Sequence, residues 1–166
     1  MTLIVEDGSG RIDAESYISV ARADAHHAAY GNSAWAGAAT TDKEAALRRA
    51  ARHLDGSYGA RLLGTQKTAD QALAWPRYGV EAAGDTPLPG NLEQAAAEAA
   101  LRALEADLAP DRSPETVIDE KRTTVGPLTT AIGFRDTSMR GPEYPLIDQL
   151  MAPFLRRRPR NRVVRA

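Results

Sequence analysis

The 166-residue sequence contains no cysteine. Disulfide bonds and thiolate metal sites are therefore excluded, and this lack fits a reducing compartment. No apolar run approaches the roughly 18 residues that cross a bilayer, so we expect no membrane span. The opening residues MTLIVEDGSG hold a short apolar patch without a basic flank, so we expect no signal peptide there.

Aromatic side chains are also scarce. They make up 5% of the chain, whereas apolar residues, of which alanine is by far the commonest, make up 43%. Because alanine buries little area, we expect a thin core between closely approaching helices. The few large side chains should supply much of that core, and the residues predicted to form it are Trp35, Leu47, Leu54, Trp75, Leu101 and Leu104.

The sequence lacks a recognisable catalytic or cofactor motif. Neighbouring His26 and His27 point about 100° apart on a helix, so they cannot share one ion as an i, i+4 pair can. We expect them to be a solvated or interface pair. The segment 6–13 loosely resembles a calcium loop but has no bidentate glutamate, which favours a plain glycine turn. We therefore expect no enzymatic activity, no metal and no cofactor.

Charge is divided unevenly along the chain. The formal net charge is −1, but the last eleven residues, RRRPRNRVVRA, hold six arginines and no acid, so the preceding residues sum to −7. An acidic body with a basic tail predicts two different partners. Arginine pairs well with carboxylate or phosphate, so we expect the tail to bind an acidic surface.

Apolar periodicity predicts three main helices. The first begins after Ser19, its N-cap, and ends before Gly31. The second runs from Thr41 to Tyr58 and opens with a capping box of Thr41 and Glu44. The third covers 92–109 and is ended by Pro110.

Two of these helices have a predicted packing face. The first carries a small-residue face of Val20, Ala21, Ala25, Ala28 and Ala29. The second should bury Leu47, Ala50, Ala51, Leu54 and Tyr58.

Irregular segments surround these helices. Residues 31–40 read as a loop that carries Trp35, and 60–90 as an irregular region that holds QALAWPRYGV. The group of Trp75, Arg77 and Tyr78 in this stretch has three interpretations: a plug for the helical core, a stacking site for nucleic-acid bases, or an oligomer contact. The local sequence favours the core plug, because large side chains are few.

The character of the sequence changes after residue 110. Residues 111–115 read as a linker, and threonine-rich 116–134 as a β-hairpin. A short amphipathic helix at 144–155 precedes the arginine tail. The predicted fold is mainly α, a small helical bundle with a projecting β-hairpin and extended terminal arms. We divide it at 1–110, 111–143 and 144–166.

The order of several motifs resembles a family of tailed-phage and prophage proteins. These are the opening LIVEDGSG and AESYISVARADAHHAAYGN, the helix KEAALRRAARHLDGSYG, the signature QALAWPR, and then ALRALEADL and VGPL. The match covers about residues 1–155 and leaves out the arginine tail. Members are often labelled DnaT-like single-stranded DNA-binding proteins. By genome position and helical architecture, the family looks like head–tail connector, or adaptor, proteins.

The resemblance implies a structural subunit of the virion. Such adaptors form a ring of twelve beneath the portal, extend the channel for double-stranded DNA and dock the next tail or stopper protein. Localisation would be the head–tail interface, after assembly in the host cytoplasm. The hairpin residues expected to contact a neighbouring subunit or tail protein are Thr123, Thr124, Thr129 and Thr130. The tail residues expected to bind the portal are Arg156, Arg157, Arg158, Arg160, Arg162, Val163, Val164 and Arg165.

The competing interpretation is the DnaT-like label itself. A protein that binds single-stranded DNA should show a basic groove interleaved with aromatic side chains. The acidic body and the few scattered aromatics favour the connector, and the tail is the part expected to contact phosphates.

Overall fold

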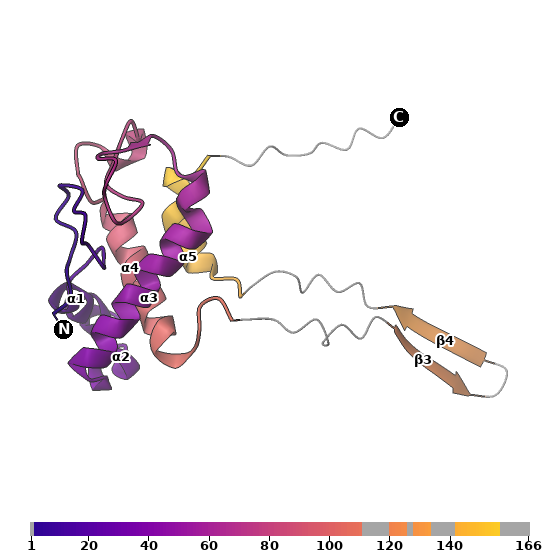
Figure 1. Cartoon of the computed structure of the whole chain (residues 1–166). Coiled ribbons are helices and arrows are strands. Elements are labelled where there is room, and N and C mark those ends of the chain that lie inside the picture. The colour runs from indigo at the N-terminus through magenta and orange to yellow at the C-terminus, as the bar shows by residue number, and fades with distance from the viewer. Residues whose placement is uncertain (1, 111–119, 126–127, 134–141, 157–166) are drawn as a thin grey trace, which may run out of the picture. The chain divides into compact units, whose positions relative to one another are not determined.

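The computed structural model describes residues 2–110, 120–125, 128–133 and 142–156, with the backbone alone for the strands at 120–125 and 128–133. The fold is mainly α with a small antiparallel hairpin, as predicted (Figure 1). The chain forms two compact units, one made of residues 1–108 and 144–166 and the other of residues 109–143. None of the helices in the described residues is long and apolar enough to cross a membrane.

The first helix begins and ends as predicted, but it buries a different face. α1 (Val20–Ala29) starts at Ser19, whose side chain accepts the N–H of Arg22. It buries Ala23 and His27, whereas four members of the predicted face are exposed: Ala21, Ala25, Ala28 and Ala29. Alanine occurs on the buried side of this helix as Ala23 and also on the exposed side, so residue type alone does not mark the inward face, and the buried contacts of His27 distinguish it.

A short helix replaces the loop predicted around Trp35. α2 (Ser33–Gly37) places Trp35 in the core, with 1% of its surface exposed. The indole Nε1–H donates to Asp24 Oδ1 at 2.7 Å, and Lys43 Nζ donates to the same oxygen at 2.9 Å. The helix therefore places the Trp35 ring in the core with its N–H directed at a carboxylate.

Two long helices form the centre of the first unit (Figure 1). α3 (Thr40–Tyr58) buries the five residues predicted for its inner face. The predicted capping box is wrong: the N-cap is Ala39, no side chain caps the helix, and Glu44 faces Arg48. Since an N-cap contributes only about 1 kcal/mol, packing along the helix can override the cap signal.

The second long helix is α4 (Gly90–Glu105). It ends four residues before the predicted end, because Ala106 is already extended with φ −154° and ψ 164°. Its alanines lie against α3, which allows the two backbones to approach closely. Leu101 and Leu104, predicted as core, are instead partly buried at the edge of the core.

The region between these helices is mostly irregular, as expected. It contains the one-turn helices η1 (Gly59–Arg61) and η2 (Glu81–Ala83) and an antiparallel pair of β1 (Thr65–Gln66) with β2 (Arg77–Tyr78). Trp75 is 1% exposed, packs against Phe154 at 5.3 Å, and donates from Nε1 to the Pro87 carbonyl at 2.6 Å. The core interpretation of Trp75 is therefore confirmed.

The last helix closes the first unit. α5 (Pro145–Met151) continues as a one-turn helix η4 (Ala152–Phe154), and Leu155 bridges to Leu62. The predicted helix at 144–155 is thus only partly α. At its start, the Tyr144 hydroxyl donates to the Leu108 carbonyl at 3.3 Å. This bond joins the two residues that flank the second unit.

The second unit contains the predicted hairpin. β3 (Glu120–Val125) pairs antiparallel with β4 (Leu128–Gly133), and the register places Thr123 opposite Thr130 and Thr124 opposite Thr129. The four threonines singled out in the sequence are therefore two cross-strand pairs. The outer parts of the predicted hairpin, 116–119 and 134, lie outside the described residues.

Candidate functional site

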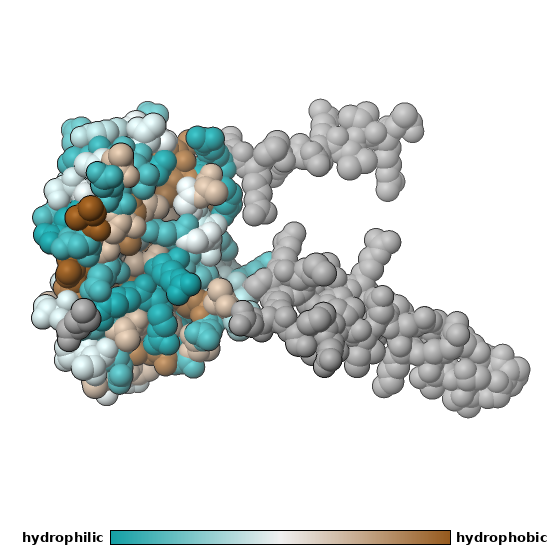
Figure 2. Space-filling view, in the orientation of Figure 1, coloured by the Kyte–Doolittle hydropathy of each residue, from teal (hydrophilic) through white to brown (hydrophobic). Residues whose placement is uncertain are grey.

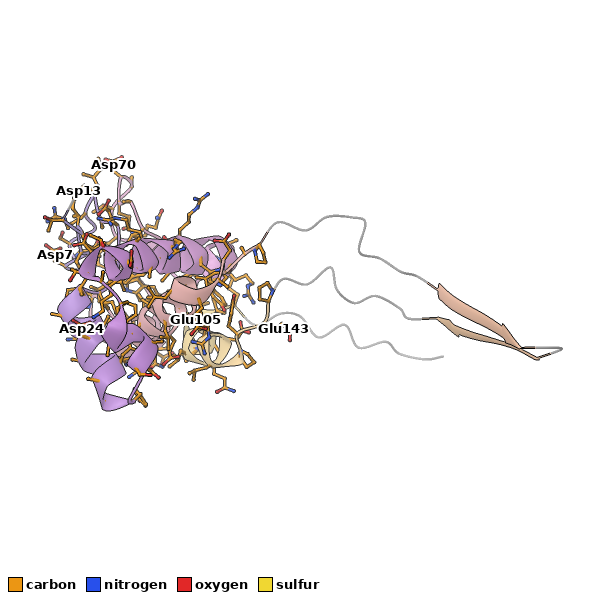
Figure 3. The ribbon with its side chains drawn as sticks, turned by 90° about the horizontal axis from the view of Figure 1, so that it is seen from below. Asp7, Asp13, Asp24, Asp70, Glu105 and Glu143 are labelled. Atoms are coloured by element: carbon orange, nitrogen blue, oxygen red, sulfur yellow. The ribbon has the colours of Figure 1, made fainter. Side chains whose placement is uncertain are left out.

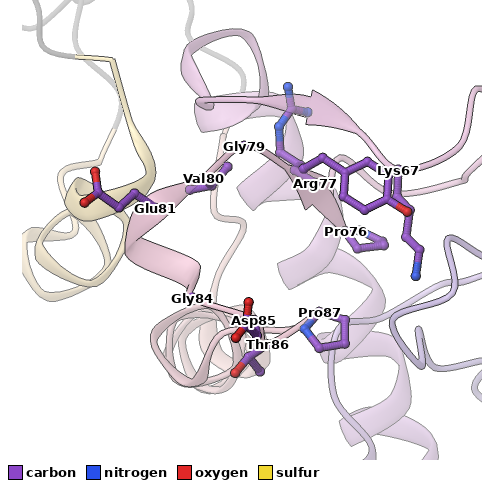
Figure 4. Close-up of a pocket in the computed structure, with 11 residues that line it drawn as sticks. Lys67, Pro76, Arg77, Gly79, Val80, Glu81, Gly84, Asp85, Thr86 and Pro87 are labelled. Atoms are coloured by element: carbon purple, nitrogen blue, oxygen red, sulfur yellow. The ribbon is translucent and has the colours of Figure 1, made fainter.

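An open groove of about 680 Å³ lies between β2 and the segment 84–87 (Figure 4). Its lining residues are Lys67, Pro76, Arg77, Tyr78, Gly79, Val80, Glu81, Gly84, Asp85, Thr86 and Pro87. Gly64 lets β1 approach β2, because its φ is +69° and a Cβ there would collide with the Tyr78 carbonyl. This close approach fixes the wall on which Tyr78 lies.

Arg77 stabilises the loop that forms one wall of the groove. Its guanidinium donates to three backbone carbonyls, those of Leu63 at 2.7 Å, Gly64 at 2.9 Å and Ala74 at 3.1 Å. Burial lowers the pKa of Arg77, and the nearby Arg156 lowers it further. This cation therefore ties the irregular loop to β1 and is already occupied by protein acceptors.

The remaining polar groups of the groove differ in whether they have partners. Lys67 Nζ donates to the Gly8 carbonyl at 2.8 Å. Glu81 and Asp85 are exposed, and their carboxylates form no ion pair or hydrogen bond with any residue that the structure describes. Tyr78 is 59% exposed. The groove thus combines an accessible aromatic ring with two unpaired carboxylates.

The arginine tail leaves the body close to this groove. The Arg156 N–H donates to the Arg61 carbonyl at 2.8 Å, and the Leu63 N–H donates to the Phe154 carbonyl at 2.9 Å. These bonds hold the end of η4 against η1 and the residues that follow it, and η4 also contacts η2, which carries Glu81. Of the predicted tail site, Arg156 is exposed. Its other members lie outside the described residues: Arg157, Arg158, Arg160, Arg162, Val163, Val164 and Arg165.

Aromatic side chains in the described part of the chain are mostly withdrawn from solvent. The two tryptophans, Tyr17 and Phe154 are each 1% exposed, whereas Tyr30 and Tyr78 are 69% and 59% exposed. Tyr30 follows α1 and Tyr78 lies on β2. The described surface therefore offers isolated aromatic rings rather than a row of them.

Comparison with known proteins decides the family. The sequence matches, over residues 1–166, the family described as "Putative DnaT-like ssDNA binding protein". The chain belongs to this family. No curated protein and no solved structure matches it. The family description agrees with the alternative given by the resemblance, single-stranded DNA binding, and does not mention a connector.

Acidic groups of this DnaT-like protein gather at one end of the body. Asp7, Asp13 and Asp70 lie there together (Figure 3). Asp13 pairs with Arg11 at 3.0 Å, and a hydrogen bond from Ser9 lowers the pKa of Asp7. On the face shown in Figure 2, hydrophilic residues predominate and brown areas are small.

The amino-terminal turn of the DnaT-like chain is organised by a buried carboxylate. Glu6, 2% exposed, accepts backbone N–H groups of Gly8, Gly10 and Arg11, each at 2.9 Å. Both carboxylate oxygens of Glu6 therefore accept hydrogen bonds from the backbone of the turn. Across the described residues, no group of three or more histidines and acids lies close enough together to hold a metal ion.

The histidine pair has different surroundings from those expected. His26 contacts Glu98 at 3.2 Å, but His27 is completely buried, with Nε2 3.1 Å from the Ala97 carbonyl and Nδ1 2.9 Å from Asn32 Nδ2. The prediction of a solvated or interface pair is therefore wrong for His27. Burial and the neighbouring His26 lower its pKa.

The sequence did not predict the groove. It grouped Trp75, Arg77 and Tyr78, but the structure gives them three separate tasks: core packing, loop fixation and exposure to solvent. The available signal was Gly79 directly after Tyr78, because a glycine with positive φ, here +74°, is typical of a turn, and turns lie mostly at the surface.

Proposed function

We propose that this protein is a structural subunit of a phage head–tail connector. In this proposal the subunits form a ring beneath the portal, extend the DNA channel and provide the docking surface for tail proteins. The observation that carries it is the burial of five of the eight described aromatic side chains, both tryptophans among them, in a body whose sequence is net acidic. A channel wall that passes DNA must not grip phosphates or stack bases, and such a surface meets that need.

The hairpin supports an assembly role. A single two-stranded hairpin is only marginally stable in water, and its edges present unpaired N–H and C=O groups. Its threonine pairs, 123 with 130 and 124 with 129, suit further strand pairing better than core packing. We propose that these strands contact a neighbouring subunit or the next tail protein.

The arginine tail supplies the proposed contact with the portal. Six arginines can pair with portal carboxylates, and Val163 and Val164 add apolar contact. One arm of this kind binds weakly, but a ring of arms engaged together binds firmly through multivalency. The ring of twelve remains an inference from the family resemblance, as does the virion location.

The test uses purified protein and empty, DNA-free portal rings imaged by electron microscopy. The full chain should form a ring on the portal, and a chain truncated after Leu155 should not. A variant with Arg49→Ala and Arg52→Ala, which removes two exposed arginines of α3, should still bind and serves as the charge control. Absence of a ring with the full chain would reject the connector, and unchanged binding by the truncated chain would reject the portal role of the tail.

Single-stranded DNA binding is the second candidate, because the family match favours it. Tyr78 is the exposed ring of the groove, and Lys67 lines the same groove. Stacking contributes about 1–3 kcal/mol per base, so Tyr78→Ala should weaken binding of a dT oligonucleotide at physiological salt by at least about fivefold. Tyr30→Ala is the matched control. Stoichiometric binding that depends on Tyr78 would support this function over the connector, and absence of binding would remove it.

A further inference from the structure

We propose that the groove beside Tyr78 is an arginine-binding site whose occupant is the tail of the same chain, residues 157–166. In the free subunit this contact would hold the tail on the body. The inference goes beyond the connector function and does not depend on it, because it concerns the isolated protein.

The chemistry of the groove suits a guanidinium group. An arginine side chain stacks on an aromatic face and pairs with a carboxylate through its planar fork of donors. The Tyr78 ring is accessible, and Glu81 and Asp85 are exposed without a partner among the described residues. The groove therefore offers one stacking surface and two free acceptors.

The two cationic residues of the groove, Arg77 and Lys67, do not pair with the carboxylates of Glu81 and Asp85. Arg77 directs its donors to three carbonyls behind β1 and β2, and Lys67 donates to the Gly8 carbonyl. Figure 4 shows Lys67 and Asp85 on different walls. An added arginine can pair with Asp85 without displacing another cation, since Asp85 forms no ion pair within the part of the chain that the structure describes.

The position of Arg156, where the tail begins, favours the tail of the same chain as the source of the arginine. Arg156, the last described residue, is hydrogen-bonded to Arg61 and lies near enough to Arg77 to lower its pKa. η4, just before it, contacts η2, and Glu81 of η2 points toward the ribbon of α5 and η4 (Figure 4). Glu81 is therefore the carboxylate of the groove whose element contacts the helix directly before the tail.

The tail has enough length and charge to reach both carboxylates. Residues 157–166 hold five arginines and no acid. Ten residues span up to about 35 Å when extended. A short tether also gives the tail a local concentration of about millimolar at the groove, which favours contact within one chain even when each ion pair is weak.

Because the chain lacks cysteine, a single label can be introduced without other changes. A nitroxide on Ala166→Cys of the full chain should broaden the backbone amide signals of residues 78–87 in NMR spectra. Broadening should vanish near 1 M salt, where the Debye length is about 3 Å. A mixed sample tests for contact between two copies. In it, one chain carries the nitroxide but no isotope label, and the other carries the isotope label but no nitroxide, so any broadening arises between chains.

Variants test the named groups. Glu81→Gln with Asp85→Asn should remove most of the broadening, and Tyr78→Ala should lower the ratio of bound to free tail about two- to fivefold. Asp70→Asn and Tyr30→Ala change exposed groups elsewhere and should leave the broadening unchanged. The proposal is overturned if 78–87 are not broadened, if the double variant has no effect, or if broadening arises only between two copies. Loss of this broadening on adding a dT oligonucleotide that shifts the same amides would also overturn it, since the groove would then belong to nucleic acid.

Discussion

Replacing Trp75 by alanine should destabilise the first unit strongly. The side chain is 1% exposed, and a buried tryptophan withdraws about 150–250 Å² from water. At about 25 cal/mol per Å², that burial contributes several kcal/mol, and large-to-small core changes of this kind cost about 3–5 kcal/mol. The Pro87 carbonyl also loses its donor, but Pro87 is exposed and water can replace that bond. We therefore expect a loss of about 3–5 kcal/mol in the free energy of unfolding.

Thermal and urea unfolding followed by far-ultraviolet circular dichroism measure this loss. For a domain of this size, 1 kcal/mol corresponds to about 2–4 °C, so the melting temperature should fall by about 6–20 °C. Trp75→Phe keeps the contact with Phe154 and should lose much less stability. Tyr78→Ala, three residues along and exposed, should change stability by less than about 0.5 kcal/mol. A melting temperature of Trp75→Ala within about 2 °C of wild type would refute the core role.

Three further predictions concern other parts of the protein. Asp24→Ala leaves the Trp35 N–H and the Lys43 ammonium without their shared acceptor and should cost about 1–3 kcal/mol in urea unfolding, while Asp24→Asn should restore part of this. His27 has a lowered pKa in the folded state, so below its ordinary value of 6.5 the unfolded chain binds a proton that the folded chain does not. The free energy of unfolding should therefore fall as pH drops below about 6.5, and His27→Gln should flatten this slope; an unchanged slope would contradict the assignment. Deleting residues 119–131, which lie in the second unit, should leave the melting of the first unit unchanged but prevent completion of particles in a complementation assay. Normal particle yield would count against the assembly role of the hairpin.

The sequence predicted the long helices because their apolar residues recur with the helical period. In α3 the alternation of Leu47 and Leu54 with arginines defines one face, and that face is buried. In α1 the same reasoning failed, because alanine occurs on both the exposed and the buried side and so gives no contrast between them. The inward face of α1 is chosen by His27, whose ring packs against Trp35 at 4.7 Å and bonds to Asn32. These partners lie on other segments, so the local pattern could not reveal them.

The candidate site was less predictable than the helices. Residues 60–90 have no period, and the exposure of Tyr78 depends on contacts made by its neighbours. The Arg77 guanidinium donates to the carbonyls of residues 63, 64 and 74, and the Trp75 indole donates to the Pro87 carbonyl. The sequence showed that the group of Trp75, Arg77 and Tyr78 was unusual. Only the folded structure shows that its three side chains have different surroundings. The tail site stays a prediction, because seven of its eight residues follow Arg156 and lie outside the described residues.

The bond between Tyr144 and Leu108 has a consequence for how this protein can vary. It joins the two residues between which the chain leaves the helical body and returns to it, so the segment 109–143 begins and ends at neighbouring points of that body. Doubling the length of such an insertion adds only about 0.6 kcal/mol of closure entropy. Insertions and deletions between 109 and 143 can therefore accumulate while the body keeps its core. We expect that the hairpin segment can be replaced by a hairpin from another protein. Tyr144 marks one of the two positions at which the replacement should be joined.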